Sequence, residues 1–248
     1  WYQRRVRGMT EENTSMTPVL QKHIGAQPIF VSISGLIGAG KSTLATALGK
    51  ALQIPVYYEP VETNVYLADF YTDMKKYGFA MQIYLFNKRF QQHQTIIWSN
   101  KSAVQDRSIY EDAIFAKVLA KQGNMSERDY NTYLDLFRNM SNFMRHPNLL
   151  VHLDVTPEEA LERIKQRSRG CEVTISLDYL RELYSEYNQF IEDISKRVPV
   201  IKVKWDQFRS ADEVAVHVLH EFRKIKRIVE VNFENQVVDD NMEQNWFF

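Results

Sequence analysis

The sequence lacks the residues that stabilise small secreted domains and that hold structural zinc. It contains one cysteine, Cys171, in 248 residues, so no disulfide can form within the chain. No group of cysteine and histidine residues has the spacing of a zinc site. This usage excludes a disulfide framework and a zinc-finger protein, and it is typical of a reducing compartment.

Long apolar runs and an excess of charge of one sign are also missing. No run approaches the ~20 apolar residues that cross a bilayer, and no apolar signal core stands near the start. The 31 basic and 31 acidic residues cancel, so no overall field attracts nucleic acid or an anionic membrane. We expect neither partner, and a cytoplasmic location. A mitochondrial location is the alternative, because Arg4, Arg5 and Arg7 cluster near the start.

The remaining composition is that of an ordinary globular protein, with 44% hydrophobic and 25% charged residues. No flexible linker interrupts residues 28–230, which we interpret as one domain. Residues 1–27 are polar and irregular and predict a disordered tail. Residues 231–248 end in three aromatic residues and form a C-terminal tail, which either folds back on the body or docks onto another protein.

Short apolar runs alternate with long helical stretches along this domain. The runs predict strands over Ile29–Ser34, Val56–Tyr58, Ala103–Gln105, Leu149–Leu153 and Val200–Val203. Helices are predicted over Lys41–Leu52, Tyr77–Asn100, Tyr110–Lys121, Glu127–Arg145, Pro157–Arg167, Leu177–Arg197 and Ala211–Val229. Apolar strands linked by helical crossovers predict an α/β fold, a five-stranded parallel sheet between two layers of helices.

Residues 35–43 read GLIGAGKST directly after the first predicted strand. They fill the P-loop pattern of glycine, four residues, then Gly-Lys-Ser/Thr. In such a loop the backbone amides surround a phosphate chain, the lysine reaches the β- and γ-phosphates, and the hydroxyl coordinates Mg²⁺. We predict that a nucleoside triphosphate is bound with Mg²⁺, and that the phosphates contact Gly35, Gly38, Ala39, Gly40, Lys41, Ser42 and Thr43.

Charged residues follow the next two predicted strands, at the edge where ligands of such sheets bind. Glu59 can take a proton from a hydroxyl that attacks the γ-phosphate, although a helix cap is the simpler alternative. Asp106 can hold Mg²⁺ and Arg107 can neutralise charge on the transferred group; their alternative is a structural Asp-Arg ion pair. The predicted catalytic residues are Glu59, Arg107 and Lys41, and the predicted metal ligands are Ser42, Asp106 and Glu59.

Three arginines, Arg163, Arg167 and Arg169, lie at the end of a predicted helix. A phosphoryl-transfer enzyme needs a cover that excludes water from the γ-phosphate. We therefore predict an Arg-rich lid that binds the phosphates, the alternative being a solvated helix face.

Gln82 and Arg89 lie seven residues apart on one predicted helix, so they share a face and stand about 10 Å apart along its axis. This separation matches the dimensions of a nucleoside. The Gln82 amide can donate and accept hydrogen bonds at a base edge. Asp112 is the expected partner of Arg89.

Together these residues resemble the deoxynucleoside kinase family, over about residues 28–229. The resemblance implies that Glu59 in YEPV is the base, that Tyr71 contacts the sugar 3′-hydroxyl and that Gln82 in MQIY reads the nucleobase. Asp106-Arg107-Ser108 stands for the family's DRS motif, and Glu172 for its lid carboxylate. Carried over by motif, the nucleoside-binding residues are Ile37, Glu59, Tyr71, Met81, Gln82, Arg89, Arg107, Asp112 and Glu172.

The resemblance also implies an activity, nucleotide salvage by transfer of the γ-phosphoryl of ATP to a deoxynucleoside 5′-hydroxyl. The segments YEPVETN, MQIY and DRSIYED look most like the bacterial and mycoplasmal deoxyadenosine/deoxyguanosine kinase branch. Arg89 and Asp112 favour deoxyadenosine, deoxycytidine or deoxyguanosine over thymidine. A homodimer joined through Tyr77–Asn100 and Glu127–Arg145 is expected. The chain departs from many members at Met81 and from animal members at Asn64, where an aromatic residue is usual.

Other functions fit the P-loop as well. A nucleoside monophosphate kinase is disfavoured because Glu59 would repel an acceptor phosphate. A GTPase is disfavoured because no [NT]KxD signature follows a strand. A noncatalytic nucleotide-binding scaffold, as in an accessory subunit of respiratory complex I with a similar fold, is disfavoured by the intact Lys41, Ser42 and Glu59.

Overall fold

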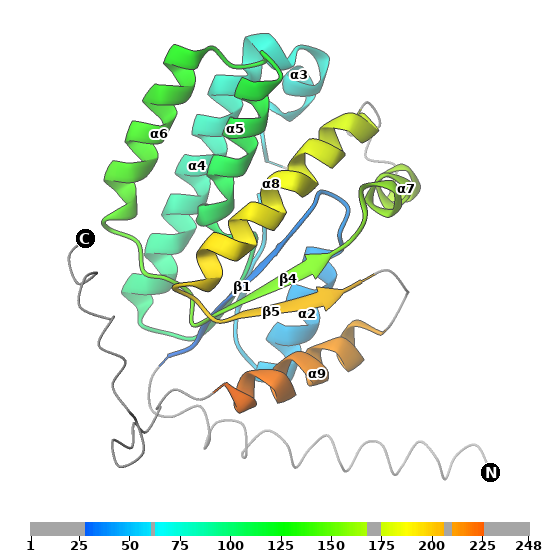
Figure 1. The fold of residues 1–248 in the computed structure, drawn as a ribbon. Helices are drawn as coiled ribbons and strands as arrows, with labels where there is room; N and C mark the ends of the chain where they lie inside the picture. Colours follow the sequence, from blue (N-terminus) through cyan, green and yellow to red (C-terminus); the bar gives the residue numbers. More distant parts are fainter. Residues whose placement is uncertain (1–27, 61–62, 168–174, 206–209, 226–248) are drawn as a thin grey trace, which may run out of the picture.

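A computed structural model describes residues 28–60, 63–167, 175–205 and 210–225 of the chain (Figure 1). The two predicted tails, 1–27 and 231–248, lie outside these ranges. Two predicted site residues, Arg169 and Glu172, lie outside them as well.

Five parallel strands form the central sheet, in the order β2-β3-β1-β4-β5. They are β1 (Phe30–Gly35), β2 (Val56–Tyr57), β3 (Ala103–Asp106), β4 (Leu149–Asp154) and β5 (Val200–Lys204). The three central strands are almost wholly buried, which explains why their sequences are apolar on both faces. The predicted sheet is confirmed. Ile33 lies opposite both Asp106, the last residue of β3, and Val151, so the carboxyl ends of the central strands lie at the same edge of the sheet.

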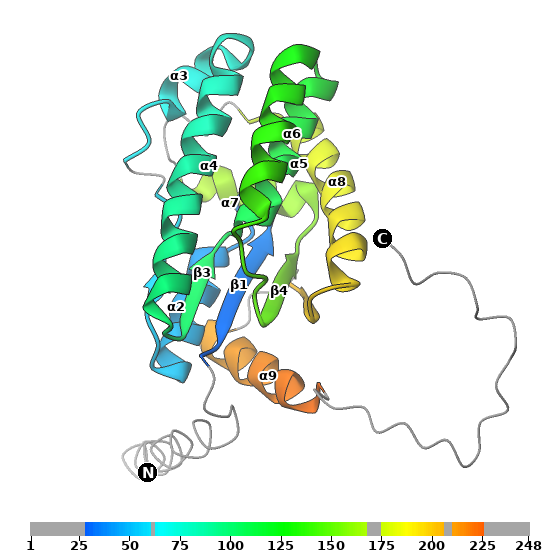
Figure 2. The same cartoon turned by 90° about the vertical axis from the view of Figure 1, so that its left-hand side faces the viewer.

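Helices cover both faces of the sheet (Figures 1 and 2). On one face lie α2 (Lys41–Leu52) and α9 (Ala211–Lys224), and on the other α4 (Met74–Ser99), α5 (Asp112–Lys121) and α8 (Leu177–Ser195). Helix α6 (Glu127–Ser141) packs on the outside of α4 and α5. Two more helices, α3 (Leu67–Thr72) and α7 (Pro157–Arg167), and the 3₁₀ turn η1 (Ile109–Glu111) lie toward the carboxyl edge of the strands.

Polar caps fix several helix starts. Ser126 accepts a hydrogen bond from the Asp129 amide at 3.1 Å, and Ser176 accepts one from the Tyr179 amide at 3.2 Å. Asp73 caps α4 in the same way, through the Lys76 amide at 3.0 Å. The predicted start of α4 at Tyr77 was therefore three residues late, and the short α3, which ends at this cap, was not predicted.

Helix α6 ends at Ser141, four residues before the predicted end at Arg145. The Arg145 amide donates instead to Nε2 of His93 in α4, at 3.1 Å, which holds the backbone away from a helical path. The α5 region also differs, because Ile109–Glu111 forms a 3₁₀ turn before the α-helix begins at Asp112. These changes leave the layers of the predicted fold intact.

Candidate active site

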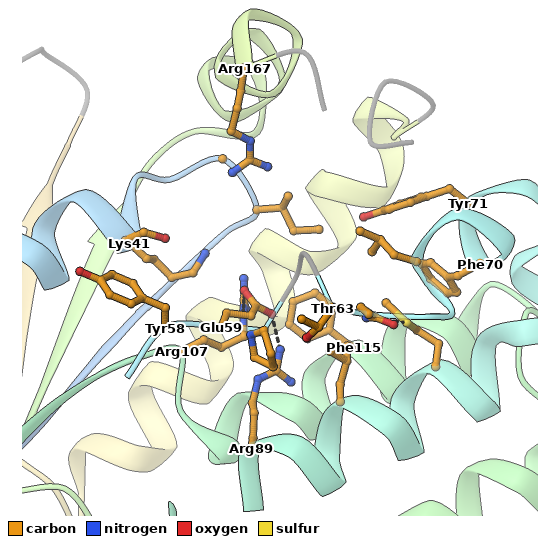
Figure 3. A pocket seen from close by; sticks show the side chains of 18 of the residues that line it. Lys41, Tyr58, Glu59, Thr63, Phe70, Tyr71, Arg89, Arg107, Phe115 and Arg167 are labelled. Carbon is orange, nitrogen blue, oxygen red and sulfur yellow. Dashed lines mark hydrogen bonds and ion pairs between the residues drawn. The ribbon is translucent and has the colours of Figure 1, made fainter. Parts of the chain in front are cut away.

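A cavity of about 670 Å³ opens at the carboxyl edge of the sheet (Figure 3). Its wall is built by the loop after β1, the segment after β2, helices α3, α4 and α5, and residues of α7 and α8. Most of the residues predicted from sequence are brought together here. The predicted residues that line it are Ile37, Gly38, Gly40, Lys41, Ser42, Thr43, Glu59, Tyr71, Met81, Gln82, Arg89, Arg107 and Arg167.

The P-loop joins β1 to the first turn of α2. Gly38 and Gly40 have φ angles of 81° and 88°, in the left-handed region that side chains rarely adopt. A Cβ atom on Gly38 would lie 2.7 Å from the carbonyl oxygen of Ala160 in α7, so the loop and α7 approach too closely for any side chain. The loop thus directs the N-terminus of α2 into the cavity, the arrangement that binds phosphate.

Lys41 lies at the floor of this loop, and its Nζ donates to the carbonyl oxygen of Leu36 at 2.8 Å. Burial and, after it, the charge of Arg107 lower the pKa of Lys41 to about 8, although the charges of Asp106 and Glu59 oppose this. A bound phosphate chain would supply the missing negative charge and favour the protonated amine. In the free site the positive charge of Lys41 is therefore only partly balanced, and an anion would complete the balance.

Ser42 and Asp106 form the part of the site that suits a divalent cation. The Ser42 hydroxyl donates to Oδ2 of Asp106, while Oδ1 of Asp106 is buried with no partner among the described residues. Burial raises the pKa of Asp106, and the charge of Lys41 opposes this. Mg²⁺ commonly takes one or two protein oxygens and completes its shell with phosphates and water, and these oxygens fit that pattern. The described part of the chain holds no group of three or more side chains that could bind a metal by themselves.

Glu59 sits between two arginines at the centre of the cavity (Figure 3). Its Oε1 accepts from Nη2 of Arg89, and its Oε2 accepts from Nε of Arg107 at 3.2 Å. Burial raises the pKa of Glu59, but Arg107, Arg89 and Lys41 outweigh burial and hold the pKa well below its usual range. The carboxylate is therefore ionised. Because both oxygens contact guanidinium groups, these contacts give no support to Glu59 as a metal ligand, which stays a prediction.

Arg107 is held by several groups at the end of β3. Its φ angle of 70° is left-handed, a strained conformation for arginine, and its amide donates to the carbonyl oxygen of Ile33 at 3.0 Å. The guanidinium carbon lies 4.8 Å from the centre of the Phe115 ring. Its Nη1 donates to the hydroxyl of Tyr187 and to Oε2 of Glu111. These contacts place Arg107 against Glu59 and Glu111, rather than in the simple ion pair with Asp106.

The far end of the cavity holds the predicted base-reading residues. Gln82 and Arg89 both face inward from α4, as their spacing predicted, and the predicted Arg89–Asp112 ion pair is present. Among the described residues, Oε1 of Gln82 and Oδ2 of Asp112 are buried without hydrogen-bond partners. Nearby, the Asn64 amide donates to Sδ of Met81 at 3.3 Å. Gln82 lines the cavity and Asp112 does not, so the unpartnered Oε1 of Gln82 is the acceptor that suits a ligand with a hydrogen-bond donor.

The two described lid arginines have different positions. Arg167 extends from α7 toward the cavity (Figure 3). Arg163 is not among the residues that line it, and its guanidinium donates to the carbonyl oxygens of Trp205 at 2.6 Å and Ala39 at 3.4 Å. Arg163 thus contacts the backbone of the P-loop. Direct phosphate binding by Arg163 stays a prediction.

Sequence reasoning missed part of the cavity wall. The residues without a recognised motif are mostly aromatic or apolar: Tyr58, Thr63, Leu67, Phe70, Leu85, Phe115 and Tyr179. Their signals in the sequence are those of ordinary core positions, so only their placement beside the cavity reveals them. Glu111 and Tyr187, which hold Arg107, were missed for the same reason.

These features define a P-loop phosphotransferase. The P-loop has a buried lysine that a bound anion would stabilise, the Ser-Asp pair suits Mg²⁺, and the cavity beside them contains a carboxylate. The family model described as deoxynucleoside kinase matches residues 31–229 of the chain. The protein therefore belongs to the deoxynucleoside kinase family and is an enzyme of that class. Neither a nucleoside monophosphate kinase nor a noncatalytic scaffold is favoured by these comparisons.

Several proteins of known name are similar in sequence to this chain over most of its length. Deoxyadenosine kinase of Dictyostelium discoideum is 51% identical over 220 residues, which cover 89% of each chain. Deoxyadenosine/deoxycytidine kinase of Bacillus subtilis is 38% identical and covers 76% of this chain and 88% of its own. A structure of deoxyadenosine kinase from M. mycoides with bound dCTP aligns with a TM-score of 0.70 and 32% identity, covering 78% of this chain and 100% of that chain.

Proposed function

We propose that this enzyme transfers the γ-phosphoryl group of ATP to the 5′-hydroxyl of deoxyadenosine, and of deoxycytidine with lower efficiency. Deoxyadenosine is the substrate named for the Dictyostelium relative, and the Bacillus relative is named for both nucleosides. The M. mycoides enzyme has structures with bound dATP and with bound dCTP, so a purine and a pyrimidine deoxynucleotide both bind that relative. The cavity of this chain has the residues to do the same.

The pattern of donors and acceptors at the inner end of the cavity is the observation that carries this proposal. Adenine and cytosine each present an exocyclic amine beside a ring nitrogen that accepts a hydrogen bond. The Gln82 amide can donate to the ring nitrogen and accept from the amine through its unpartnered Oε1. Asp112 does not line the cavity but pairs with Arg89, which does. Thymine presents a carbonyl in place of that amine and an N–H in place of the ring acceptor, so it would need the Gln82 amide in the reversed orientation.

At the other end, Glu59 accepts a hydrogen bond from the 5′-hydroxyl and orients it toward the γ-phosphate. Its low pKa makes it a weak base in the free enzyme, so the proton is best transferred late, when the oxygen already bonds to phosphorus. Lys41, Arg107 and Arg167 are the cations that would face the charge of the transferred group. Mg²⁺, held through Ser42 and Asp106, would neutralise charge on the β- and γ-phosphates.

Steady-state kinetics with the four deoxynucleosides, ATP and Mg²⁺ test the proposal. We expect kcat/KM to be highest for deoxyadenosine, lower for deoxycytidine, and about tenfold or more lower for thymidine, because thymidine requires the Gln82 amide to reverse. An Asp112→Asn variant provides the comparison, since it removes the charge that holds Arg89 in the cavity wall. Thymidine turnover within threefold of deoxyadenosine in the parent enzyme would contradict the proposal.

We also propose that two copies associate through α4 and α6, the helices predicted for a homodimer. Trp98 near the end of α4 and Phe143 just after α6 are each 76% exposed, and Leu136 of α6 is 37% exposed. Large apolar side chains on one outer layer mark an association surface more often than an isolated exposed residue does. Sedimentation should show twice the mass of one chain, and Trp98→Glu combined with Phe143→Glu should give monomers. A parent protein that sediments as a monomer at micromolar concentration contradicts this.

The location and the C-terminal tail rest on sequence alone. No helix in the described part of the chain is both long and apolar enough to cross a membrane. We propose a cytoplasmic location because of the single cysteine, and imaging of a fluorescent fusion tests it against a mitochondrial one. The docking role of residues 231–248 falls outside the described residues and stays a prediction.

A further inference from the structure

A buried tyrosine outside the cavity is bonded to the arginine at its centre. Tyr187 lies in the third turn of α8, is 1% exposed, and does not line the cavity. Its hydroxyl accepts a hydrogen bond from Nη1 of Arg107 and donates one to Oε2 of Glu111 at 2.8 Å. A phenol has one proton to donate, and both of these bonds match its capacity.

The hydroxyl is held neutral and in one orientation. Burial raises the pKa of Tyr187 well above its usual value, although the charge of Arg107 opposes this. Glu111 is fixed on its other side, because its Oε1 accepts from the Ser108 amide at 2.8 Å and from the Ser108 hydroxyl at 3.1 Å. Tyr187 therefore contacts a carboxylate that cannot turn away without losing the cap of η1.

The same bonds continue into the site. Arg107 donates through Nε to Glu59, and Glu59 accepts in turn from Arg89, which pairs with Asp112. One network thus runs from Ser108 through Tyr187 to the residues proposed to orient the 5′-hydroxyl and read the base. Tyr187 is the member that comes from α8; the others named here come from the segment after β2, from α4 and from the β3–α5 region.

We propose that Tyr187 is a positioning residue for phosphoryl transfer, which fixes the guanidinium of Arg107 and, through it, the carboxylate of Glu59. Arg107 needs such support because its backbone is held in the strained left-handed region. The Phe115 ring limits its movement on one face, and the hydroxyl of Tyr187 fixes its Nη1. The proposal rests on the kinase function and is independent of which base is preferred.

Tyr187→Phe removes one oxygen and tests the proposal. We expect kcat to fall about 10- to 100-fold, since a small misplacement of reacting groups has that effect, while KM for ATP changes less than about threefold. Tyr133→Phe is the matched control, because Tyr133 is also fully buried and its hydroxyl has no partner among the described residues. It should retain parental kcat. Both variants are assayed well below their melting temperatures, with whichever deoxynucleoside the parent uses best.

A double-mutant cycle shows whether Tyr187 acts through Arg107. In an Arg107→Lys background, whose kcat is already reduced, Tyr187→Phe should lower kcat by less than about twofold, because the side chain that it positions has been replaced. Glu111→Gln removes the charge of the carboxylate that accepts from Tyr187 and replaces Tyr187→Phe as the test if that variant does not fold. It should also lower kcat more than it raises KM.

A folded Tyr187→Phe with kcat within twofold of the parent overturns the proposal. Equal fold-losses in both backgrounds would also overturn it. A parent that prefers another base contradicts only the proposed specificity.

Discussion

At the residue scale, the site is a set of charges that balance one another before any substrate binds. Glu59 contacts Arg89 and Arg107, Arg89 contacts Asp112, and Arg107 contacts Glu111. Buried charges are tolerated only when paired in this way. The pairing fixes each side chain in position, and preorganised charge is what stabilises a transition state in phosphoryl transfer.

Replacing Glu59 tests its role directly. Glu59→Gln keeps the shape of the side chain but removes the charge that we propose accepts the proton of the hydroxyl. We expect kcat to fall by about 10² to 10⁴, the scale of a lost general base, while ATP binding by calorimetry changes little.

A matched control is Glu186→Gln on α8, a nearly buried carboxylate that pairs with Lys117 and Lys121 away from the cavity. It should lower the melting temperature and leave kcat near that of the parent. Near-normal turnover in Glu59→Gln would remove Glu59 from the mechanism.

At the element scale, the P-loop depends on its contact with α7. The Gly38 position lies against Ala160 of that helix, and the Ala39 carbonyl accepts from Arg163 of the same helix. Helix α7 carries Arg167, which lines the cavity. The conformation of the P-loop therefore depends on its contacts with α7 as well as on its own glycines.

Gly38→Ala should disturb this contact. The new Cβ would meet the Ala160 carbonyl at 2.7 Å, and φ is 81°, so the loop must move away from α7. We expect KM for ATP to rise about tenfold or more, since a displaced loop no longer directs its amides at the phosphates.

Gly123→Ala is the matched control, because it introduces similar backbone strain without a clash. Gly123 has a similar φ of 71°, but an added Cβ there meets nothing within 4 Å. This variant should lose about 1 kcal/mol of stability and keep its KM for ATP. If both variants bind ATP equally well, contact with α7 does not shape the loop.

At the scale of the whole molecule, buried neutral histidines make the fold sensitive to acid. His93 joins α4 to the segment after α6, and His152 lies in β4 with its Nδ1 3.2 Å from the Ser34 hydroxyl. Burial lowers the pKa of each to about 4, and for His93 the charge of His146 contributes to this value. The unfolded chain therefore binds protons more readily than the folded protein does. The free energy of unfolding has its full value above about pH 6.5 and falls as the pH drops toward 4.

Urea unfolding at pH 7 and pH 5 measures this effect. Protonation in the unfolded state should cost about 3 kcal/mol per histidine by pH 4, with about 2 kcal/mol of that already lost at pH 5. His93→Gln should reduce the difference in unfolding free energy between the two pH values, even though it lowers stability at pH 7. His217→Gln, on the exposed side of α9, should leave the difference unchanged. An unchanged pH dependence in His93→Gln would contradict the assignment.

The sequence by itself determined the order of strands and helices along the chain and placed most of the predicted site residues at one edge of the sheet. Apolar strands alternating with helices permit few arrangements, and a P-loop has fixed spacing because its backbone shape is fixed. Since parallel strands end at one edge, Glu59, Asp106 and Arg107 were predicted to converge there; Arg107 bonds to Glu59, and Asp106 bonds to Ser42 of the P-loop. The seven-residue spacing of Gln82 and Arg89 likewise placed both on the inner face of α4.

Tertiary structure decided which partners those residues have. Nothing in the sequence indicates that Tyr187 bonds to Arg107, because the two are 80 residues apart and Tyr187 belongs to an ordinary amphipathic helix. The same holds for Phe115 beneath Arg107 and for Arg163 against the P-loop backbone. Local periodicity determines which face of a helix is buried, but the packing of whole helices against the sheet determines which buried atoms touch.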